Sequence, residues 1–595
     1  MFFTPIKRSL YRITVPILVT ILFFSCQKEL SVENGNIVVT PPDLTTKIKS
    51  SVSGFVTDEN EAPVTGATVQ FGASSTTTDK YGYFEVRNVQ IVKIAAVVTV
   101  SKTGYFKGIK TYAATEGKSA FFRIKLIPKT TVGNINAATG GNVTLSNGLS
   151  IVLPAGAVMN AATNAPYTGT VNVAAYWINP EAADLDRVMP GDLRAINTDG
   201  ALKLLKTFGM AAVELTGSGG ELLQILTGKT ATLTFPIPSS LMGDAPSSIP
   251  LWYFDESNGL WKEQGSAVKT GNAYTGDVTH FSYWNCDFPF PNAVQFDCTV
   301  VDALGHPVPY QNVSISYSNG QYTGCHGYTD SLGWVGGNIP ANSQLILQVF
   351  GSGCFTPLVA VPFTTTNANI FLGNISVANS PLLASITGNL IDCNAQPVTN
   401  GYVILFVGNT YLRFNVSNSN SFYFNVTLCG SNTVTLIGGD IPAAQEGYLN
   451  NYPLVSGNNN IGGLVACGTS TVEFVNYTID GIPLSITPAN GYISQSPDSS
   501  IINSVQVSAY QNNNASILFA FSKLNISPGS IQDLTNFNSV QTGQTTISGT
   551  IPVSITEYGN LGQYIAGSFT GSVISVAPPN TVHTISCNFR FKRYY

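Results

Sequence analysis

The sequence is poor in charge, in histidine and in helical periodicity. Aspartate, glutamate, lysine and arginine together make up 10% of its 595 residues, against ~25% in average soluble proteins. The formal net charge is −5 and no basic patch stands out, which argues against nucleic acid as a partner. Apolar residues at helical spacing are scarce, and 200–217 is the one stretch where we consider a short helix.

The motifs of common enzyme classes are also missing. Residues 226–230, LTGKT, contain the end of a phosphate-binding loop, but Leu223 stands where that loop requires its first glycine. No GxSxG, HExxH or GxGxxG sequence precedes a suitable element. The four histidines are scattered over three expected domains, at positions 280, 306, 326 and 583. Nothing selects a Ser-His-Asp set or a pair of carboxylates, so we predict no catalytic residues and no cofactor.

A zinc site is not expected, because the sequence has no CxxC spacing and no Cys/His cluster. Nine cysteines are present, and eight of them lie at position 286 or later. An even number in an exported chain suggests disulfides. These eight candidates are Cys286, Cys298, Cys325, Cys354, Cys393, Cys429, Cys467 and Cys587. We expect local pairs within 286–354 and within 393–467; the alternative is buried free thiols.

No apolar segment is long enough to span a membrane as a helix, which requires ~20 residues. The longest candidate at the N-terminus is the twelve-residue run 13–24, which follows Lys7, Arg8 and Arg12. A charged region before a short apolar region is the layout of a secretory signal. The chain is therefore predicted to be exported, and its mature form to lack a transmembrane helix.

The end of that signal, FFSCQKE, resembles the lipobox of bacterial lipoproteins, in which the cysteine is acylated and becomes the new N-terminus. Ser25 directly precedes Cys26, although Phe23 and Phe24 depart from the family's preferred residues. The alternative is a removed signal in which Cys26 is incidental. A polar linker with two prolines follows, as suits a tether. The Gln27-Lys28-Glu29 run after Cys26 resembles the export signal of some Gram-negative surface lipoproteins. We therefore expect a lipid-anchored, surface-exposed protein of the bacterial outer membrane.

Strands and turns are favoured by what the sequence contains. Hydrophobic residues make up 44% of the chain, with 56 glycines and 32 prolines, so packed cores, short strands and tight turns are expected. One pattern recurs three times, as DENEAPVTGATV from Asp58, DALGHPVPYQNV from Asp302 and DCNAQPVTNGYV from Asp392. Aspartate caps a turn, proline fixes φ as the chain re-enters a strand, and the last valine begins an alternating strand.

A second turn follows, as TDKYGYF at 78–84 and TDSLGWV at 329–335, and decays to NSNSFYF in the third copy. With SKTGYFKG at 101–108, these motifs resemble the carboxypeptidase regulatory-like domain. That resemblance implies a transthyretin-like β-sandwich without catalytic residues. The repeated acids allow two interpretations, a calcium site or turn capping. We favour capping, because calcium needs six to eight oxygens and these acids are isolated.

Residues 131–291 lack the repeat. GGNVTLSNGLSIVLPAGAV at 140–158 resembles the opening of a ZU5-like β-sandwich, and IPLWYFDESNGLWKEQG at 249–265 is typical of a hairpin. With THFSYWNCD at 279–287, the region resembles the ectodomain of astroprincin-type membrane proteins and cartilage intermediate layer protein. This resemblance implies an extracellular matrix or surface role.

Four of the five tryptophans lie in this region, namely Trp177, Trp252, Trp261 and Trp284. One hypothesis is a sugar-stacking platform, for which these four are the candidate residues. We favour the other, burial in the sandwich core, because tryptophan buries a large area. Similarly, His280, Asn285 and Asp287 suggest a polar site, but we interpret them as a strand end and its turn.

Together these patterns predict an all-β chain of tandem transthyretin-like or Ig-like β-sandwiches behind a lipoprotein signal and linker. The expected boundaries are 1–25 for the signal, 26–49 for the linker, and 50–130, 131–291, 292–380, 381–475 and 476–595 for the β domains. We expect a non-catalytic surface protein that binds extracellular protein, matrix or glycan and is held to the membrane by its lipid. The alternatives are a carbohydrate-binding accessory lipoprotein for polysaccharide uptake and an unrecognised hydrolase.

Overall fold

The computed structural model describes residues 41–593, apart from positions 291–292, 321, 352, 378–379, 408–409, 430–432, 468, 471–472, 487–491, 498–503, 512–514, 523–524, 548 and 560–563. The expected signal, the expected lipidation site at Cys26 and most of the expected linker lie outside the described residues. Within the described ranges, the structure contains no helix with the length and apolar character needed to cross a membrane.

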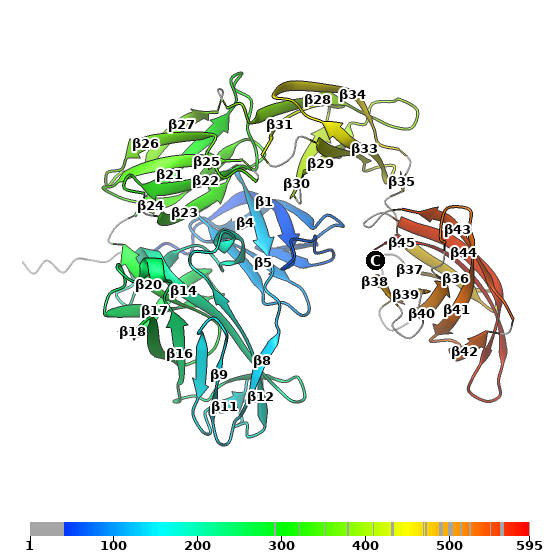
Figure 1. The fold of residues 1–595 in the computed structure, drawn as a ribbon, viewed down its shortest axis with the longest axis horizontal. Helices are drawn as coiled ribbons and strands as arrows, with labels where there is room; N and C mark the ends of the chain where they lie inside the picture. Colours follow the sequence, from blue (N-terminus) through cyan, green and yellow to red (C-terminus); the bar gives the residue numbers. More distant parts are fainter. Residues whose placement is uncertain are drawn as a thin grey trace, which may run out of the picture. The chain divides into compact units, whose positions relative to one another are not determined.

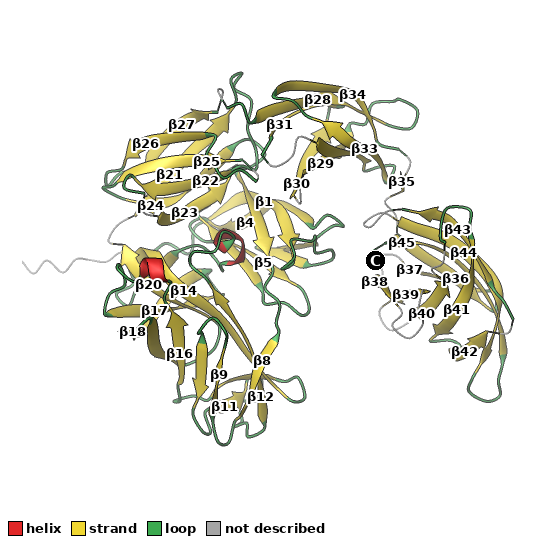
Figure 2. Ribbon diagram, viewed as in Figure 1, coloured by secondary structure: helices red, strands yellow, loops and turns green. Residues whose placement is uncertain are grey.

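The described chain is almost entirely β-structure, which confirms the predicted fold class (Figure 1, Figure 2). Its helical content in the described ranges consists of α1 (Leu185–Val188) and the short 3₁₀ turn Ser239–Leu241. The helix considered within 200–217 is wrong, because Leu202–Gly217 forms the long strand β14. This strand packs Phe208 and Val213 into one core and Leu205 and Met210 into another. Burial of both faces removes the polar–apolar alternation that normally marks a strand.

The three sequence copies fold with the same strand order, and we call them repeats 1, 2 and 3. Repeat 1 has β1 (Lys47–Thr57), β2 (Thr68–Phe71), β3 (Ser74–Thr77), β4 (Tyr83–Val92), β5 (Ala96–Ser101), β6 (Gly108–Tyr112) and β7 (Ser119–Lys125). Its two sheets have the orders β4-β1-β7 and β3-β2-β5-β6. They share one core that includes Val52, Phe71, Phe84 and Val98, so repeat 1 is a β-sandwich.

Repeat 2 has β21 (Ala293–Val301), β22 (Asn312–Tyr317), β23 (Tyr322–Tyr328), β24 (Trp334–Pro340), β25 (Gln344–Phe350), β26 (Val359–Thr364) and β27 (Ile370–Ser376). Repeat 3 has β28 (Leu383–Ile391), β29 (Asn400–Val407), β30 (Thr410–Ser417), β31 (Ser421–Thr427), β32 (Thr433–Asp440), β33 (Gln445–Pro453), β34 (Gly457–Val465) and β35 (Thr469–Ser470). The sheet orders β24-β21-β27 and β31-β28-β34 repeat that of β4-β1-β7. In all three, the first strand pairs in parallel with the last member of this sheet.

The recurring aspartates are turn caps. Asp58 Oδ1 accepts hydrogen bonds from the N–H groups of residues 60 and 62 at 2.9 and 2.8 Å. Asp302 and Asp392 accept the corresponding pairs, from residues 304 and 306 and from residues 394 and 396. The proline of each copy then forms a single bridge to the strand it follows. Local hydrogen bonds therefore explain the spacing from aspartate to proline.

The second recurring turn requires its glycine. Gly82 has φ 72° and Gly333 has φ 75°, and a Cβ on either would lie 2.3 or 2.4 Å from the carbonyl oxygen of Val56 or Val300. In both copies the preceding aspartate, Asp79 or Asp330, caps the turn with two backbone hydrogen bonds. In repeat 3, Asn420 occupies the equivalent place, because its carbonyl accepts the hydrogen bond that Gly82 and Gly333 accept.

The first turn offers a stability prediction. Its third residue after aspartate has positive φ in every copy, 65° at Glu61, 82° at Gly305 and 59° at Ala395. Ala395→Gly should therefore raise the free energy of unfolding by about 0.5–1 kcal/mol, because alanine is strained in this conformation. Urea denaturation checks this. Glu61→Gly is the matched control: it should give no gain, because Glu61 pairs with Lys125 and Arg187 at 3.0 and 2.7 Å. Equal gains at both sites would contradict the account.

The region between repeats 1 and 2 is a large sheet that includes β14 (Figure 1). Its other strands are β8 (Thr131–Asn136), β9 (Gly141–Thr144), β10 (Ser150–Leu153), β11 (Val158–Asn160), β12 (Thr170–Ile178), β13 (Arg194–Ile196), β15 (Leu222–Ile225), β16 (Ala231–Pro236), β17 (Ser248–Asp255), β18 (Leu260–Thr270), β19 (Ala273–Val278) and β20 (Tyr283–Phe290). β20 lies between β14 and β17 and pairs with both. Polar side chains on β20 are thus placed in the interior of the sheet.

The C-terminal strands form another sheet around one apolar core. They are β36 (Phe474–Ile479), β37 (Ile482–Ile486), β38 (Tyr492–Pro497), β39 (Ser504–Gln511), β40 (Ala515–Ser522), β41 (Ile531–Ser539), β42 (Gly543–Ile547), β43 (Pro552–Tyr558), β44 (Tyr564–Ser575) and β45 (Val582–Lys592). Phe519, Phe569 and Phe589 lie in this core. Phenylalanine alternates with basic residues near the C-terminus, but Arg590 and Lys592 are buried as well, at 5% and 8% exposed, so this end of β45 is covered on both faces.

Candidate functional site

Three of the four tryptophans are buried in the core, which is the interpretation that we favour, and they do not form a sugar-binding platform. Trp252, Trp261 and Trp284 are each 0% exposed. Their indole N–H groups donate to backbone carbonyls, those of Asp287, Asp192 and His280, at 2.8–2.9 Å. Trp177 is half-buried and packs against the core. The rings fill the interior because large aromatic surface is most stable away from water when the indole N–H finds an acceptor.

The polar residues near the end of this region are also not a strand end. Asn285 and Asp287 lie within β20, and both are 0% exposed. His280 precedes the strand and contacts Trp284 with its ring tilted, the two ring centroids lying 5.2 Å apart. The expected turn is wrong because β20 is central rather than at the border of the sheet. The structure therefore separates His280 from two buried polar side chains.

Asn285 and Asp287 meet a third residue, Thr207 on β14, and we call these three the polar cluster. The cluster forms at a β-bulge, where Phe208 and Gly209 oppose a single residue between the pairs Thr207↔Asp287 and Met210↔Asn285. Gly209 has φ 143°, a conformation that favours glycine. The bulge turns the Thr207 side chain towards β20, and bulges are enriched next to functional sites.

The hydrogen bonds of the polar cluster join all three side chains. Thr207 Oγ1 lies 3.2 Å from Asn285 Oδ1 and donates to it. Gly209 N–H donates to Thr207 Oγ1 at 3.1 Å, so the hydroxyl group accepts one hydrogen bond and donates another. Asn285 Nδ2 donates to Asp287 Oδ2. The other oxygen of that carboxyl group, Asp287 Oδ1, is buried without a hydrogen-bond partner.

Burial raises the pKa of Asp287 well above its ordinary value, and hydrogen bonds from Thr207, Asn285 and the Phe208 N–H lower it only in part. The groups that lower it are hydrogen-bond donors and not a basic side chain. Such surroundings favour the neutral form of the carboxyl group, because an unpaired charge is costly to bury. The polar cluster therefore combines a hydroxyl group, a carboxamide and a neutral carboxylic acid in a water-excluded place.

A second polar arrangement lies in the C-terminal sheet. Asp480 Oδ2 is 2.7 Å from His583 Nδ1, and His583 Nε2 is 3.0 Å from Ser575 Oγ. These distances equal those of a Ser-His-Asp triad, which is defined by geometry and not by motif. The sequence did not select this set because the three residues come from the turn after β36, the end of β44 and the start of β45.

The surroundings of Ser575 indicate a structural role. Its hydroxyl donates to the Thr542 carbonyl at 2.9 Å, and its residue is 8% exposed. The next amide, Val576 N–H, donates to the Gln544 carbonyl and so is not free to bind an oxyanion. Asp480 also accepts from Thr584 N–H at 2.9 Å. The network fastens the turn after β36 to β44 and β45.

We therefore expect that a fluorophosphonate probe will not label Ser575 in the native chain. His583→Ala should instead lower the free energy of unfolding by about 1–2 kcal/mol, because it removes two hydrogen bonds. Chemical denaturation and probe labelling are measured on the same samples. Ser586→Ala, on the same strand, is the control and should change neither. Labelling that His583→Ala abolishes would identify a hydrolase and contradict the structural role.

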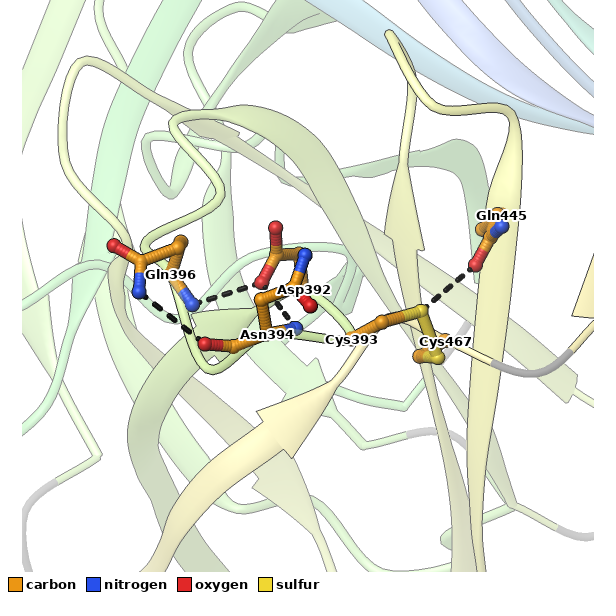
Figure 3. The surroundings of a disulfide bond; sticks show 6 residues. All are labelled: Asp392, Cys393, Asn394, Gln396, Gln445 and Cys467. Atoms are coloured by element: carbon orange, nitrogen blue, oxygen red, sulfur yellow. Dashed lines mark hydrogen bonds between the residues drawn. A yellow bond between two sulfur atoms is a disulfide. The ribbon is translucent and has the colours of Figure 1, made fainter.

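The cysteines form two disulfides among the described residues, Cys393–Cys467 and Cys354–Cys429. The first is a local pair within 393–467, as expected, and Figure 3 shows it beside the Asp392 turn and Gln445. The second joins the loop after β25 of repeat 2 to the residues after β31 of repeat 3. The expectation of local pairing within 286–354 is therefore wrong.

The remaining four disulfide candidates are free thiols, which corrects the prediction for them. They are Cys286, Cys298, Cys325 and Cys587. Each lies on a different strand, β20, β21, β23 or β45, and three of them are buried in separate cores. Thiols packed in this way behave as small apolar side chains.

These thiols should resist alkylation in the native state. Burial raises the pKa of Cys298 and Cys325 to about 12, and it raises the pKa of Cys286 and Cys587 as well. Iodoacetamide at pH 8.5 should leave all four unmodified, and unfolding should expose them, as peptide mapping would show. Because the unfolded thiols ionise first, stability should fall as the pH rises through the ordinary value of 9.0. Rapid native modification would contradict this.

Comparison with known proteins identifies part of the chain. Residues 51–126 match the carboxypeptidase regulatory-like domain family. Human cartilage intermediate layer protein 2 is 31% identical over 124 residues, which cover 21% of this chain and 10% of that protein. The mouse protein is 27% identical over 161 residues, covering 26% and 14%. The chain thus spans only about a tenth to a seventh of the length of these relatives.

Among solved structures, the Bacillus anthracis TIE protein is similar at 8% identity and a TM-score of 0.15, covering 70% of this chain and 50% of that one. The shaft pilin SpaA from Lactobacillus rhamnosus GG is similar at 12% identity and a TM-score of 0.14, covering 30% and 99%. TM-scores this low support no inference about this chain. The comparisons thus establish a carboxypeptidase regulatory-like domain at residues 51–126 and a partial similarity to cartilage intermediate layer protein 2.

Proposed function

We propose that the chain is a non-catalytic, lipid-anchored protein of the bacterial cell surface with an adhesive or structural role. The observation that carries the proposal is the threefold recurrence of one capped sandwich. In each repeat the aspartate that could have served a ligand is occupied by backbone N–H groups. Such a framework supplies rigid modules whose loops and faces are available for recognition.

One end of repeat 2 is suited to binding a protein or matrix partner. Leu304, Leu332 and Phe355 are 77%, 59% and 100% exposed. The pairings Thr299↔Trp334 and Asn312↔Phe350 bring their three loops to the same end of the sandwich. This end also contacts repeat 3, through Asp302 and the Cys354–Cys429 disulfide, and the three side chains stay exposed beside that contact. Exposed apolar side chains are unremarkable singly, but a group of them marks a candidate interaction surface. We call Leu304, Leu332 and Phe355 the apolar tip.

The polysaccharide-uptake alternative depended on the tryptophans, and three of these are fully buried. A hydrolase would need a substrate-accessible nucleophile, whereas Ser575 is hydrogen-bonded into the C-terminal sheet. The exposed apolar tip favours a protein or matrix surface as the partner over a sugar or a substrate.

The test is attachment of cells that display the chain to surfaces coated with matrix proteins or glycans. The variant Leu304→Ser/Leu332→Ser/Phe355→Ser should reduce attachment at least about tenfold, since interface anchors contribute ~1–2 kcal/mol each. The matched control carries Leu222→Ser and Val268→Ser, which are exposed elsewhere at 53% and 57%. Unchanged attachment of the tip variant, at equal surface amounts, would contradict the proposed contact.

A further inference from the structure

We propose that the Thr207 hydroxyl and the Asn285 carboxamide join in an intramolecular ester bond, with Asp287 as the acid–base group. This inference concerns chemistry inside the sheet and does not rest on the proposed function. It follows from the polar cluster, in which a nucleophile, an acyl group and a proton carrier meet in one buried place.

The reacting groups are held in position before reaction. Thr207 Oγ1 touches the Asn285 amide oxygen at 3.2 Å, so the amide carbon next to that oxygen is within reach of the hydroxyl. The bulge fixes this orientation, because it places Gly209 N–H where it donates a hydrogen bond to Thr207 Oγ1 at 3.1 Å. Gly209 also could not be replaced without strain, since a Cβ there would lie 3.1 Å from Trp177 Nε1. The fixed geometry supplies the proximity that intramolecular acyl transfer requires.

Asp287 is placed to move the proton. Asn285 Nδ2 donates to Asp287 Oδ2, so the carboxyl group touches the nitrogen that would leave. Thr207 and Asp287 lie opposite one another on β14 and β20, so the hydroxyl group is close to this carboxyl group as well. Its other oxygen, Oδ1, has no partner, which is an uncommon and costly condition for a buried polar atom. A purely structural role of Asp287 does not explain why Oδ1 is buried without a partner. A proton relay does, because it uses both oxygens of a neutral carboxylic acid.

The reaction balances without a co-reactant. Thr207 Oγ1 attacks the Asn285 side-chain carbonyl carbon. As the hydroxyl proton passes to one oxygen of the Asp287 carboxylic acid, the acid gives the proton on its other oxygen to the Asn285 nitrogen. The carbon–nitrogen bond then breaks and ammonia leaves. One O–C bond and one N–H bond have formed, one C–N bond and one O–H bond have broken, and Asp287 is again a neutral carboxylic acid. No atom is oxidised or reduced.

The surroundings protect the product. Thr207, Asn285 and Asp287 are 8%, 0% and 0% exposed, so water has little access to hydrolyse the ester. Ammonia is diluted into solvent once it leaves, which favours the joined form. The bond would tie β14 to β20, two strands whose pairing is interrupted by the bulge.

The test is mass spectrometry of the purified full chain. We expect peptide mapping to give a linked pair, one peptide with Thr207 and one with Asn285, whose mass is the sum of the two less one ammonia. Hydroxylamine should release the pair, since it cleaves esters and leaves amides intact. Loss of ammonia through cyclisation of an asparagine would stay on a single peptide and is distinguished in this way.

Variants identify the roles of the three residues. Thr207→Val should yield only unlinked peptides, and Thr207→Ser should restore the link because it restores the hydroxyl. Asp287→Asn should slow formation about 100-fold or more, in the range of general acid–base catalysis. Thr234→Val is the control, since Thr234 pairs with the Thr275 hydroxyl in the same sheet and should leave the link unchanged.

Circular dichroism verifies that each variant is folded. If the folded wild-type chain gives only separate peptides, the proposal is overturned, and this result does not depend on any variant. A link that persists in Thr207→Val would equally overturn it.

Discussion

Replacing Cys393 and Cys467 together by alanine is expected to lower the free energy of unfolding of repeat 3 by about 4 kcal/mol. The bond closes a loop between residues 74 positions apart, and a cross-link of that span removes much of the freedom of the unfolded chain. The bond joins the loop after β28 to the residues after β34. It therefore links the first strand of repeat 3 to a strand near the end of that repeat. Urea denaturation, followed by protease sensitivity of repeat 3, measures the loss.

The matched control is Cys587→Ala, which removes a buried thiol and no disulfide. It should cost no more than about 1–2 kcal/mol, the effect of a small cavity, and only in the C-terminal sheet. The Cys354→Ala/Cys429→Ala variant should release the covalent link between repeats 2 and 3 and leave the core of each intact. A loss below about 1 kcal/mol for the Cys393/Cys467 variant would show that the bond does not constrain repeat 3.

The Trp252→Ala variant is expected to lose about 3–5 kcal/mol of stability, as truncations of buried aromatic residues do. Trp252 is 0% exposed, packs in one of the two cores beside β14, and donates its indole N–H to the Asp287 carbonyl at 2.9 Å. Calorimetry of the full chain measures the loss as a shift of the transition of this region.

Tyr176→Ala is the control, because Tyr176 is 39% exposed in the same sheet. It should change the transition little. The sugar-platform interpretation makes the opposite prediction for Trp252, unchanged stability and lost glycan binding. That outcome would refute burial as the role of the tryptophans.

The repeated sandwiches could be predicted because their signals are local. The aspartate caps, the proline after each cap and the glycines at 82 and 333 are all satisfied within a few residues. Turns of this kind depend on residues that are close in sequence, so they can be recognised from one amino-acid sequence. Because the same spacing recurs three times, the sequence indicated three domains with the same fold.

What the sequence could not show depends on distant partners. β14 was interpreted as helical because two cores bury both of its faces. Cys354 pairs with Cys429 in a different repeat, a choice that spacing does not encode. Thr207 meets Asn285 only through a bulge between two strands, so no motif joins them. A buried aspartate without a basic partner is visible only once the sheet is assembled.

We propose that the sandwiches are held at the cell surface as binding modules. The most direct test of this proposal is at Cys26. Cells are fed a labelled fatty acid, and the wild-type chain is compared with Cys26→Ala. We expect the wild type to carry the label, to remain in the membrane fraction and to be cleaved by protease added to intact cells. The variant should be unlabelled and released. A wild-type chain that is soluble, unlabelled and still carries a free thiol at position 26 would contradict the account.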